Sequence, residues 1–600
     1  MVATPAGTRD IGRVKRFTGA PWAWAAYGVV TILIGLDLYA SLGASLAVTR
    51  TTVAVWILIT AGFAVWRWWI DSEQPRWVLA IAVAGASIGA IVFYGHTLSL
   101  DAIKAAVGLF WILAGAIELI EWRTLPRPIL QSPWLCASTI FIGVVTTTFP
   151  SQLVVQFTFV AAVWAFVLGG LCVVRALWLA FLSRRGERRD SGLMRAISTG
   201  LPAVLLLFPI LGYGNLMDNT RAADSQQSRL AAFYEVPPDL APGVPGSVIR
   251  FEPLTVDGIH GRGWRILFRS EDVHGRATVS PGVVFAPADI GSNRTVVAWA
   301  HGTVGLGPMC APSRDPDMLH HIPWVNQALD RGWVVAAADY AGAGGTGVGE
   351  KYMVIADQAR DVINSVRAAR ELSSGAGNAY ATYGESQGGL ISLAAGALGA
   401  SYASELTLVG IGGVASASDI GSLMQSKWDR PLATWLLGPH LVRAWTREYP
   451  NLAASTILTS AANEHYAQIA DEGCIFDILG ALINPQIGLF LSRDPTADPD
   501  WRAAFIANRA PDPPAGVPVF VGHGLADPLI DPSISASLVQ RYCTTGATVR
   551  TLWMPGVEHI GSSTVAAPTY MDWLGGLVSG GGAPSSCAEP LPVAPAPALN

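Results

Sequence analysis

The stretch AYATYGESQGGLISLAAGALGA, residues 379–400, decides how the second half of this chain folds. A short β-prone run leads into Gly384-Glu385-Ser386-Gln387-Gly388-Gly389, and a helix of small residues follows. Strand, sharp turn and helix is the setting in which a G-x-S-x-G sequence presents a serine on a nucleophile elbow. Side chains at Gly384 and Gly388 would collide with the neighbouring strand and helix. We therefore predict that Ser386 is a nucleophile.

The composition separates the chain into two parts. Its 600 residues exceed one ordinary domain, and they are 51% hydrophobic and only 14% charged, against about a quarter charged in soluble proteins. The apolar excess lies in the first third. We predict a membrane domain over 1–215, a linker over 216–245, a folded domain over 246–580 and a Pro/Ala-rich, mobile tail over 581–600. The net charge of −5 and the lack of a dense basic stretch argue against nucleic acid as a partner.

Residues 1–215 contain seven apolar stretches, each near the roughly 20 residues that a helix needs to cross a bilayer. The stretches cover 24–46, 51–70, 77–95, 103–121, 132–150, 153–181 and 196–213. The first lacks a clear small-x-small cleavage site and is followed at once by another span, so we interpret it as a membrane helix and not as a signal peptide. The pattern predicts a bundle of seven transmembrane helices.

Lysine and arginine alternate across the expected connections. The N-terminal tail and the even connections carry most of them: Arg9, Arg13, Lys15, Arg16, Arg76, Arg123, Arg127, Arg184, Arg185, Arg188 and Arg189. The odd connections hold little beyond Arg50 and Lys104. Because cytoplasmic loops are enriched in these residues, we predict an integral protein of the cell membrane with a cytoplasmic N-terminus. Everything after about residue 214 would then lie outside.

The membrane part also contains an internal repeat. ILITAGFAVWRW, WILAGAIELIEW and FVLGGLCVVRALW align on Gly62, Gly115 and Gly169, with spacings of 115 − 62 = 53 and 169 − 115 = 54 residues. The repeat predicts three helical hairpins followed by a connector helix, with small residues where helices approach closely. This arrangement, over about residues 20–185, resembles the six-helix acid-resistance membrane proteins (HdeD-like).

From Val248 onward, short β-prone runs alternate with amphipathic helices. VIRFEPL, GWRILFRS and SPGVVFAPA suggest opening antiparallel strands, and TVVAWAHG, WVVAAADYAG, AYATYG, LTLVGIGGVA, VPVFVGHG and TVRTLWMPG follow. Continuous apolar strands that alternate with helices indicate a mainly parallel, doubly wound sheet. A tryptophan-rich segment, about 419–516, interrupts the alternation, and we expect it to form a helical cap over the site.

A serine hydroxyl needs a base, usually a histidine that a carboxylate orients. Downstream of Ser386 the chain offers HGLADPLID and MPGVEHIGSS, each after a β-prone run and thus at a strand's carboxyl end, where open α/β sheets build their sites. We predict Asp527 as the acid and His559 as the base, with Asp531 as the competing acid. A plain glycine turn at the serine would leave the later acid and histidine unexplained.

The oxyanion that forms in acyl transfer needs two preorganised donors. We expect one from the backbone N–H of Gln387, directly after the nucleophile. The other is expected from the loop after TVVAWA, at the N–H of Thr303, with Gly302 beside it. His301 in that loop is expected to be structural, and His523, before the acid, to be a packing residue.

With these residues in place, a family resemblance appears. HGTVGLGPMCAPS, DYAGAGGTG, YGESQGG, GHGLADPLI and GVEHIG, in this order, resemble the secretory lipase family of α/β-hydrolases over roughly residues 235–577. The resemblance implies an α/β-hydrolase fold with a helical cap, ester hydrolysis that often acts on acylglycerols, and the triad Ser386, Asp527 and His559.

The chain has six cysteines. Cys136 and Cys172 fall in expected spans and are predicted to be free. The other four fall in the part predicted to lie in an oxidising place and allow three pairings, of which we favour Cys310–Cys474 and Cys543–Cys587. With no C-x-x-C and no histidine cluster recognised, we expect no metal and no cofactor.

The favoured interpretation is a membrane-anchored, outward-facing serine hydrolase of the lipase or carboxylesterase type. Its substrates would be acylglycerols or other acyl-lipids, and its other contact would be the bilayer. One alternative is an acyltransferase that uses the same triad. Another is a stress-related membrane protein whose outer domain only binds lipid.

Overall fold

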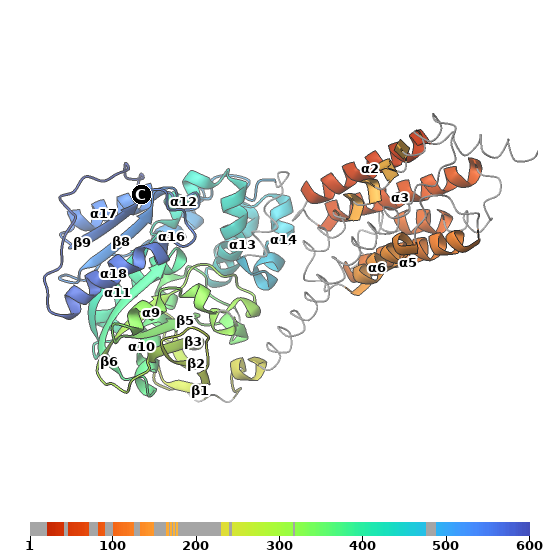
Figure 1. Ribbon diagram of the computed structural model, residues 1–600. Helices are drawn as coiled ribbons and strands as arrows, with labels where there is room; N and C mark the ends of the chain where they lie inside the picture. Colours follow the sequence, from red (N-terminus) through yellow and green to blue (C-terminus); the bar gives the residue numbers. More distant parts are fainter. Residues whose placement is uncertain are drawn as a thin grey trace, which may run out of the picture. The chain divides into compact units, whose positions relative to one another are not determined.

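The computed structural model describes residues 21–40, 46–70, 82–90, 100–124, 133–148, parts of 162–180, and 230–599 except 239, 241–242, 316–317, 348 and 476–487. The chain divides into two compact units (Figure 1). One unit comprises Met1–Ala223 with Gly480–Ile487, and the other comprises Asp224–Leu479 with Gly488–Asn600.

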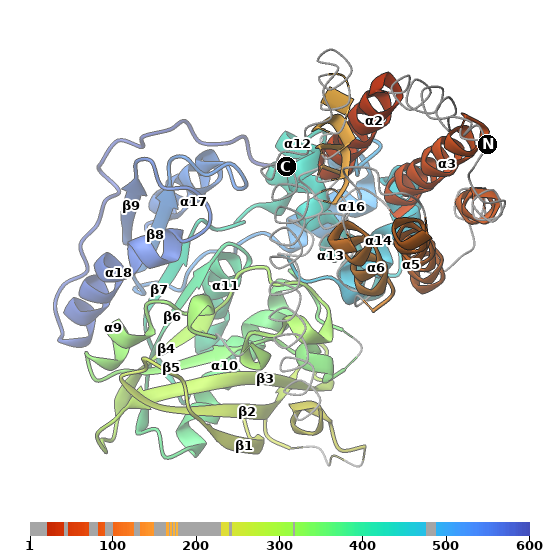
Figure 2. The same cartoon turned by 45° about the vertical axis from the view of Figure 1, so that its right-hand side comes forward.

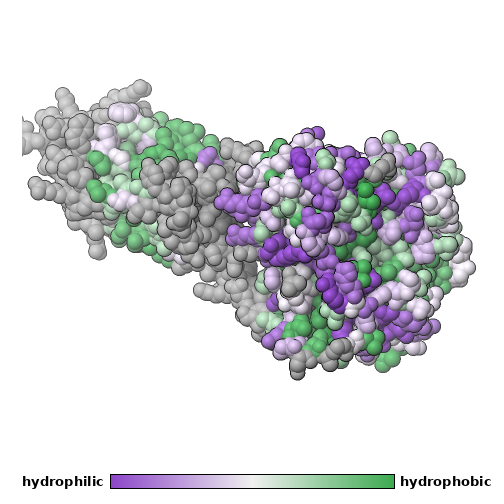
Figure 3. Space-filling model, turned by 180° about the vertical axis from the view of Figure 1, so that it is seen from behind, coloured by the Kyte–Doolittle hydropathy of each residue, from purple (hydrophilic) through white to green (hydrophobic). Residues whose placement is uncertain are grey.

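The described part of the first unit is helical. Its longer helices are α2 (Pro21–Ala40), α3 (Leu46–Ile70), α5 (Leu100–Thr124) and α6 (Pro133–Thr148), which fall on four of the seven expected spans. The spans 77–95 and 153–181 are described in part, and 196–213 lies outside the described residues. None of the helices within the described ranges is long and apolar enough to cross a membrane. In the view of Figure 3 these helices present mainly hydrophobic residues, whereas the second unit presents many hydrophilic ones.

Glycines bring some of these helices close together, as the repeat predicted. A Cβ on Gly115 would lie 2.8 Å from the carbonyl oxygen of Cys136, and one on Gly169 would lie 2.6 Å from that of Gly28. A Cβ on Gly62 would meet none of the described residues within 4 Å. Close approach is therefore confirmed at two of the three aligned glycines, and the described residues show no such approach at the third. The HdeD-like resemblance stays a prediction.

The second unit is built on a nine-stranded sheet in the order β1-β2-β3-β5-β4-β6-β7-β8-β9. The strands are β1 (Val248–Leu254), β2 (Gly261–Glu271), β3 (Ala277–Pro287), β4 (Arg294–Ala300), β5 (Val334–Ala338), β6 (Ala376–Glu385), β7 (Thr407–Val414), β8 (Val519–Gly524) and β9 (Val549–Met554). The pairs β1–β2, β2–β3 and β3–β5 are antiparallel. The pairs from β5–β4 to β8–β9 are all parallel. Figure 2 shows β1–β3 at one edge and β8 and β9 at the other. The predicted antiparallel start and parallel remainder are confirmed.

Helices cover both faces of the sheet. Helices α10 (Ile355–Glu371) and α11 (Gln387–Tyr402) pack together on one face, and α9 (Val325–Leu329) and α18 (Ser562–Val578) pack on the other (Figure 1). The parallel strands are therefore buried on both faces, which explains their nearly continuous apolar sequences. Helix α17 (Pro532–Thr544) lies between β8 and β9 in sequence and contacts both.

An aromatic cluster lies under the carboxyl ends of the central strands. The ring of Tyr383, in β6, stacks on Tyr570 at 4.1 Å and lies 5.4 Å from Trp299, in β4. The hydroxyl of Tyr383 also donates to the carbonyl oxygen of Ser563 at the start of α18. This cluster joins the strand before the elbow to the helix after the predicted base.

Short helices separate β7 from β8. They are α12 (Ile420–Lys427), α13 (Pro431–Glu448), η6 (Ala454–Thr456), α14 (Ser460–Glu472), η7 (Pro495–Ala497) and α16 (Pro499–Ala507), within the segment where the cap was expected. Trp445 and Trp501 are buried and stack 6.2 Å apart, so these two cap tryptophans serve the core of the segment.

The C-terminal tail packs against the second unit, so the prediction of a mobile tail is wrong. The N–H of Ser586 donates to the carbonyl oxygen of Val549 at 2.7 Å, and that of Ala596 donates to Ser533 at 3.0 Å. The Leu599 side chain is buried. Proline-rich composition prevents the tail from forming a core of its own, but it does not prevent docking on a core that exists.

Candidate active site

Ser386 stands at the sharp turn between β6 and α11. Its backbone has φ 59° and ψ −120°. A non-glycine residue held in such a conformation costs on the order of 1–3 kcal/mol and persists only where its surroundings enforce it. Here the N–H of Ser386 donates to Val414 at 2.9 Å, and its carbonyl oxygen accepts from Leu390 at 3.2 Å. The turn is thus tied to the next strand and to its own helix.

The glycines on either side of Ser386 are required by close packing. A Cβ on Gly384 would lie 2.1 Å from the carbonyl oxygen of Gly388, and one on Gly388 would lie 1.9 Å from that of Ala300. Any side chain at these positions would displace backbone. The structural reason that the sequence suggested for both glycines is therefore confirmed.

The structure brings together the three side chains predicted as a triad. Nε2 of His559 lies 2.9 Å from Oγ of Ser386, and Nδ1 of His559 lies 2.6 Å from Oδ2 of Asp527. All three residues are buried. They come from the carboxyl ends of β6, β8 and β9, as expected for an open α/β sheet. An Nδ1–H that donates to the carboxylate leaves the Nε2 lone pair facing the serine hydroxyl.

The surroundings of Asp527 favour its charged form. Burial alone would raise the pKa of Asp527, but hydrogen bonds from His523 and His559 lower it well below its usual range. Its Oδ1 also accepts from the N–H groups of Leu529 and Ile530, both at 2.9 Å. The competing Asp531 instead accepts from the N–H of Ser533 and caps α17.

His523 was expected to be a packing residue, but it makes polar contacts, including one with the predicted acid. Its Nε2 lies 3.3 Å from Oδ2 of Asp527 and 3.0 Å from the carbonyl oxygen of Ile530. Its Nδ1 lies 2.7 Å from Oγ of Ser535. The buried imidazole therefore contacts the same carboxylate oxygen, Oδ2, as His559 does. The sequence offered a hint, since His523 and Asp527 are four residues apart after one strand.

The loop after β4 runs beside the nucleophile, where the oxyanion donors were expected. A Cβ on Gly302 would lie 3.6 Å from Cβ of Ser386. Oγ1 of Thr303 lies 2.7 Å from the hydroxyl of the buried Tyr352, so a hydrogen bond fixes the Thr303 side chain. The N–H groups of Thr303 and Gln387 remain our predicted donors.

The side chain of Gln387 is held by a buried acid that the sequence analysis missed. Oε1 of Glu350 accepts from Nε2 of Gln387 at 2.9 Å and from Nε2 of Gln358 at 2.7 Å. Burial raises the pKa of Glu350 to about 8. Glu350 follows the stretch DYAGAGGTG, but its partner Gln387 lies 37 residues further on, so only the folded chain reveals this contact.

Glu385, directly before the nucleophile, is the second residue that was missed. Its carboxylate accepts from the hydroxyls of Ser562 and Ser563, at 2.8 and 2.5 Å, and from the N–H of Ser563 at 3.1 Å. Ser562 also donates to the carbonyl oxygen of His559 at 2.9 Å. Glu385 therefore ties the elbow to the segment that carries the histidine.

Both favoured disulfides are present in the structure. Cys310–Cys474 joins the loop after β4 to the segment between β7 and β8, and Cys543–Cys587 joins α17 to the tail. Beside the first, the N–H of Ile475 donates to the carbonyl oxygen of Val304 at 2.8 Å. Cys136 and Cys172 are buried and belong to neither of these disulfides.

His301 is buried, as a structural residue would be. Its Nδ1 lies 2.7 Å from the carbonyl oxygen of Gly302, and burial lowers its pKa to about 4. It is therefore neutral near pH 7 and shapes the loop after β4.

Comparisons with known proteins agree with this architecture. The model of the secretory lipase family matches residues 321–583. A probable inactive lipase of Mycobacterium tuberculosis is 26% identical over 383 residues, which is 57% of this chain and 80% of the relative. Lipase A of Arthroderma benhamiae is 23% identical over 380 residues, 57% of this chain and 78% of the relative.

A solved structure shows the same fold. Candida antarctica lipase A in its closed state superposes with a TM-score of 0.51 at 15% identity, over 60% of this chain and 89% of that one. The C-terminal part of this chain therefore has the α/β-hydrolase fold of a lipase.

Proposed function

We propose that the C-terminal part of this chain is a serine hydrolase that cleaves carboxylic esters. The observation that carries the proposal is the unbroken line of hydrogen bonds from Asp527 through His559 to Ser386 at a strained elbow. The match to the secretory lipase family supports the same class of reaction.

In the first half of the reaction, Oγ of Ser386 attacks the ester carbonyl carbon, and Nε2 of His559 takes the proton of the serine hydroxyl. The carbonyl oxygen becomes an oxyanion, which the N–H groups of Thr303 and Gln387 would stabilise. His559 then gives its proton to the leaving alcohol as the carbon–oxygen bond breaks, and an acyl-enzyme remains on Ser386.

In the second half, His559 takes a proton from water, whose oxygen attacks the acyl carbon. The second oxyanion collapses, His559 returns the proton to Oγ of Ser386, and the carboxylic acid leaves. Asp527 keeps its charge throughout and stabilises the imidazolium, which agrees with the lowered pKa of its carboxyl.

One relative is named a probable inactive lipase, so activity needs support from this chain itself. Here the nucleophile, base and acid are all present, and their side chains lie within hydrogen-bond distance of one another. Glu385 and His523 support the histidine segment and the acid from outside the triad. An inactive descendant would not need to keep this whole arrangement.

We propose acylglycerols or other acyl-lipids as the substrate class. The resemblance to secretory lipases supports it, and so does an apolar side chain at the edge of the site. Ile560, directly after His559, leaves 69% of its surface exposed. A fatty acyl chain would gain roughly 25 cal/mol for each Å² of apolar surface that it covers there.

Labelling with a fluorophosphonate probe and an ester profile test the proposal together. The purified full chain should be labelled at Ser386 and should hydrolyse p-nitrophenyl esters, with kcat/KM rising from acetate towards longer acyl chains. A chain that is folded by circular dichroism but neither labelled nor active would overturn the hydrolase proposal. If activity is greatest on the acetate ester, the hydrolase proposal stands, but the proposal that the substrates are acyl-lipids is wrong.

We also propose that residues 1–215 attach the enzyme to the cell membrane and hold its hydrolase part outside. Support comes from the seven apolar stretches and from the alternating lysine and arginine content of their connections. The described helices also leave large apolar side chains exposed, such as Trp22 at 67% and Leu177 at 66%. Contiguous exposed apolar surface is typical of membrane or protein contacts.

A further inference from the structure

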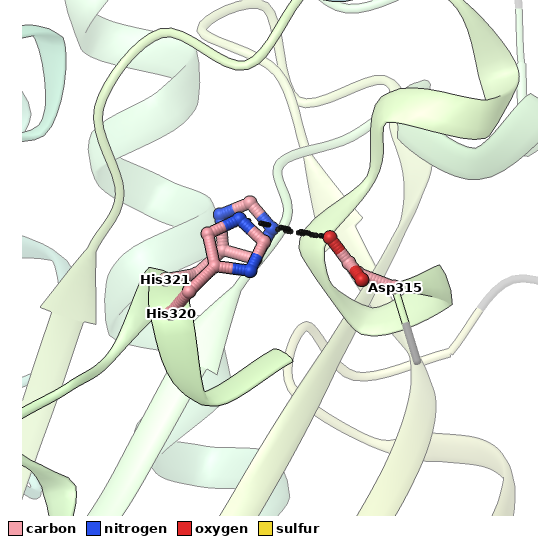
Figure 4. Close-up of side chains that lie close together, drawn as sticks. All are labelled: Asp315, His320 and His321. Carbon is pink, nitrogen blue, oxygen red and sulfur yellow. Dashed lines mark hydrogen bonds and ion pairs between the residues drawn. The ribbon is translucent and has the colours of Figure 1, made fainter. Parts of the chain in front are cut away.

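Two neighbouring histidines and an aspartate converge in the segment between β4 and β5 (Figure 4). Nε2 of His321 lies 3.0 Å from Oδ2 of Asp315, and Nε2 of His320 lies 3.7 Å from the same oxygen. One ligand atom from each of the three residues lies within 4.8 Å of the others. We propose that Asp315, His320 and His321 form a zinc site.

The donor set selects the metal. Imidazole nitrogen and carboxylate oxygen are usual ligands of Zn²⁺, whereas Ca²⁺ and Mg²⁺ prefer oxygen alone. Bonds of about 2.0–2.1 Å in a tetrahedral site place ligand atoms roughly 3.3 Å apart. The separations of 3.0 and 3.7 Å lie on either side of that spacing. Zn²⁺ would take the place of the hydrogen bond between Nε2 of His321 and Oδ2 of Asp315.

The backbone holds these ligands in place. Asp315 closes the turn η3 (Pro312–Arg314), and its N–H donates to the carbonyl oxygen of Pro312 at 3.1 Å. The histidines end the turn η4 (Met318–His321), which is anchored by the buried side chains of Met318 and Ile322. The two imidazole rings lie 3.7 Å apart.

The site is open on one side. The exposed fractions of the side chains are 41% for His320, 30% for Asp315 and 11% for His321. The described part of the chain supplies three ligands here, and a water molecule would take the fourth position of a tetrahedral zinc ion.

The site lies close to the loop that carries the predicted oxyanion donor. His321 and His301 line the same small cavity, of about 10 Å³, together with Asp339. His301 is the first residue of the loop after β4. We infer that zinc joins η3 to η4 close to the loop after β4 and makes that loop more rigid, without touching the reacting atoms. The residues involved are therefore positioning residues.

Zinc binding to the full chain, stripped with a chelator, tests the proposal. Competition with a chromophoric chelator should show one equivalent of Zn²⁺ bound, and Co²⁺ in its place should give the visible spectrum of a tetrahedral site. His320→Gln and His321→Gln should each weaken binding by more than the roughly 10- to 100-fold that loss of an outer partner costs. Zn²⁺ should also raise the Tm of the original chain and leave that of His320→Gln unchanged.

His260→Gln is the matched control, because His260 forms an exposed pair with Asp330 at 2.9 Å. It should bind zinc as the original chain does. Absence of stoichiometric binding, or equal binding by His320→Gln, would overturn the site. Because 41% of the His320 side chain is exposed, against 11% for His321, His320→Gln should leave the fold intact. It therefore keeps the test decisive if His321→Gln fails to fold. Binding is measured without substrate, so failure here is distinct from failure of the proposed hydrolase.

Discussion

One oxygen of Glu350 accepts two amide hydrogen bonds in a buried place, and its protonation should affect the stability of the whole unit. Unfolded, this carboxyl ionises near its ordinary pKa of 4.5, whereas burial raises the folded pKa to about 8. Between these values the folded state binds more protons than the unfolded state, so rising pH favours unfolding.

The first prediction is that Glu350→Gln makes the stability less dependent on pH. Gln keeps an oxygen that can accept both hydrogen bonds but has no proton to lose. From pH 5 to pH 8, the original chain should lose stability more steeply than the variant, by about 1 kcal/mol for each pH unit. Thermal unfolding across this range measures the slopes. Glu464→Gln, at a side chain that is 76% exposed, should follow the original chain. Equal slopes in all three proteins would contradict the raised pKa.

The second prediction concerns the serine and the histidine. Ser386→Ala should reduce ester hydrolysis by roughly 10⁴- to 10⁶-fold, and His559→Ala should be nearly as severe. The double variant should be no worse than either single variant, because the two groups act as one unit. Initial rates on a p-nitrophenyl ester measure this. Full activity in Ser386→Ala would end the hydrolase interpretation.

The third prediction separates the two aspartates. Asp527→Asn should lower kcat by roughly 10²- to 10⁴-fold, because the imidazole loses its charged partner. Asp531→Asn should change kcat by less than about tenfold, and Asp531→Ala should cost about 1 kcal/mol of stability as a lost helix cap. Paired kinetics and thermal melts decide. The reverse ranking in kcat would show that Asp531 is the acid.

At the residue scale, the sequence could predict groups that sit in local patterns. Ser386 lies in a motif, and Asp527 and His559 follow strands that are recognisable by themselves. Glu350 and Glu385 could not be found this way, because their partners lie 37 and 177 residues away. Their place depends on how the loops cross at the sheet edge, which no local pattern encodes.

At the scale of elements, one disulfide joins the loop after β4 to the segment between β7 and β8. Cys310–Cys474 closes a loop of 164 residues, so it should stabilise the fold by limiting the unfolded chain. It also lies beside the pairing of Val304 with Ile475, close to the predicted donor Thr303. Its loss should therefore affect stability and catalysis together.

The fourth prediction compares the two disulfides. Cys310→Ser with Cys474→Ser, and Cys543→Ser with Cys587→Ser, should each lower stability by about 2–5 kcal/mol. The first pair should also reduce kcat/KM, because the oxyanion loop loses its tie, whereas the second pair, which ties the tail to α17, should not. Denaturant titrations and ester kinetics give both values. Equal kcat/KM in the two double variants would show that the Cys310–Cys474 disulfide does not contribute to catalysis.

Elements differ in how well the sequence predicts them. The strands were predictable because parallel strands buried on both faces need continuous apolar runs. The docked tail was not, since its contacts use backbone groups, such as the N–H groups of Ser586 and Ala596, that any sequence supplies. The burial of Trp445 and Trp501 was not predictable either, because composition does not distinguish a side chain in the core of the segment from one that lines a site.

At the scale of the whole molecule, the proposed attachment to the membrane makes the fifth prediction. A reporter that is active only outside the cytoplasm, fused after Gly214, should be active, and one fused within Arg184–Arg189 should be silent. The lysine and arginine bias of residues 1–215 is the reason. A reporter that is active only in the cytoplasm, fused at the same places, should give the opposite pattern. The inverse result in both series would reverse the orientation.

The separation of Cys310 from Cys474 also sets an order of events during biosynthesis. At about 5–20 residues per second, a ribosome needs on the order of ten seconds to add the 164 residues between them. Asp527 and His559 are made later still, so the nascent polypeptide carries a nucleophile long before it has an acid or a base. If the finished protein is exported and attacks acyl-lipids, as proposed, the membrane that it passes through is therefore spared until synthesis is almost complete.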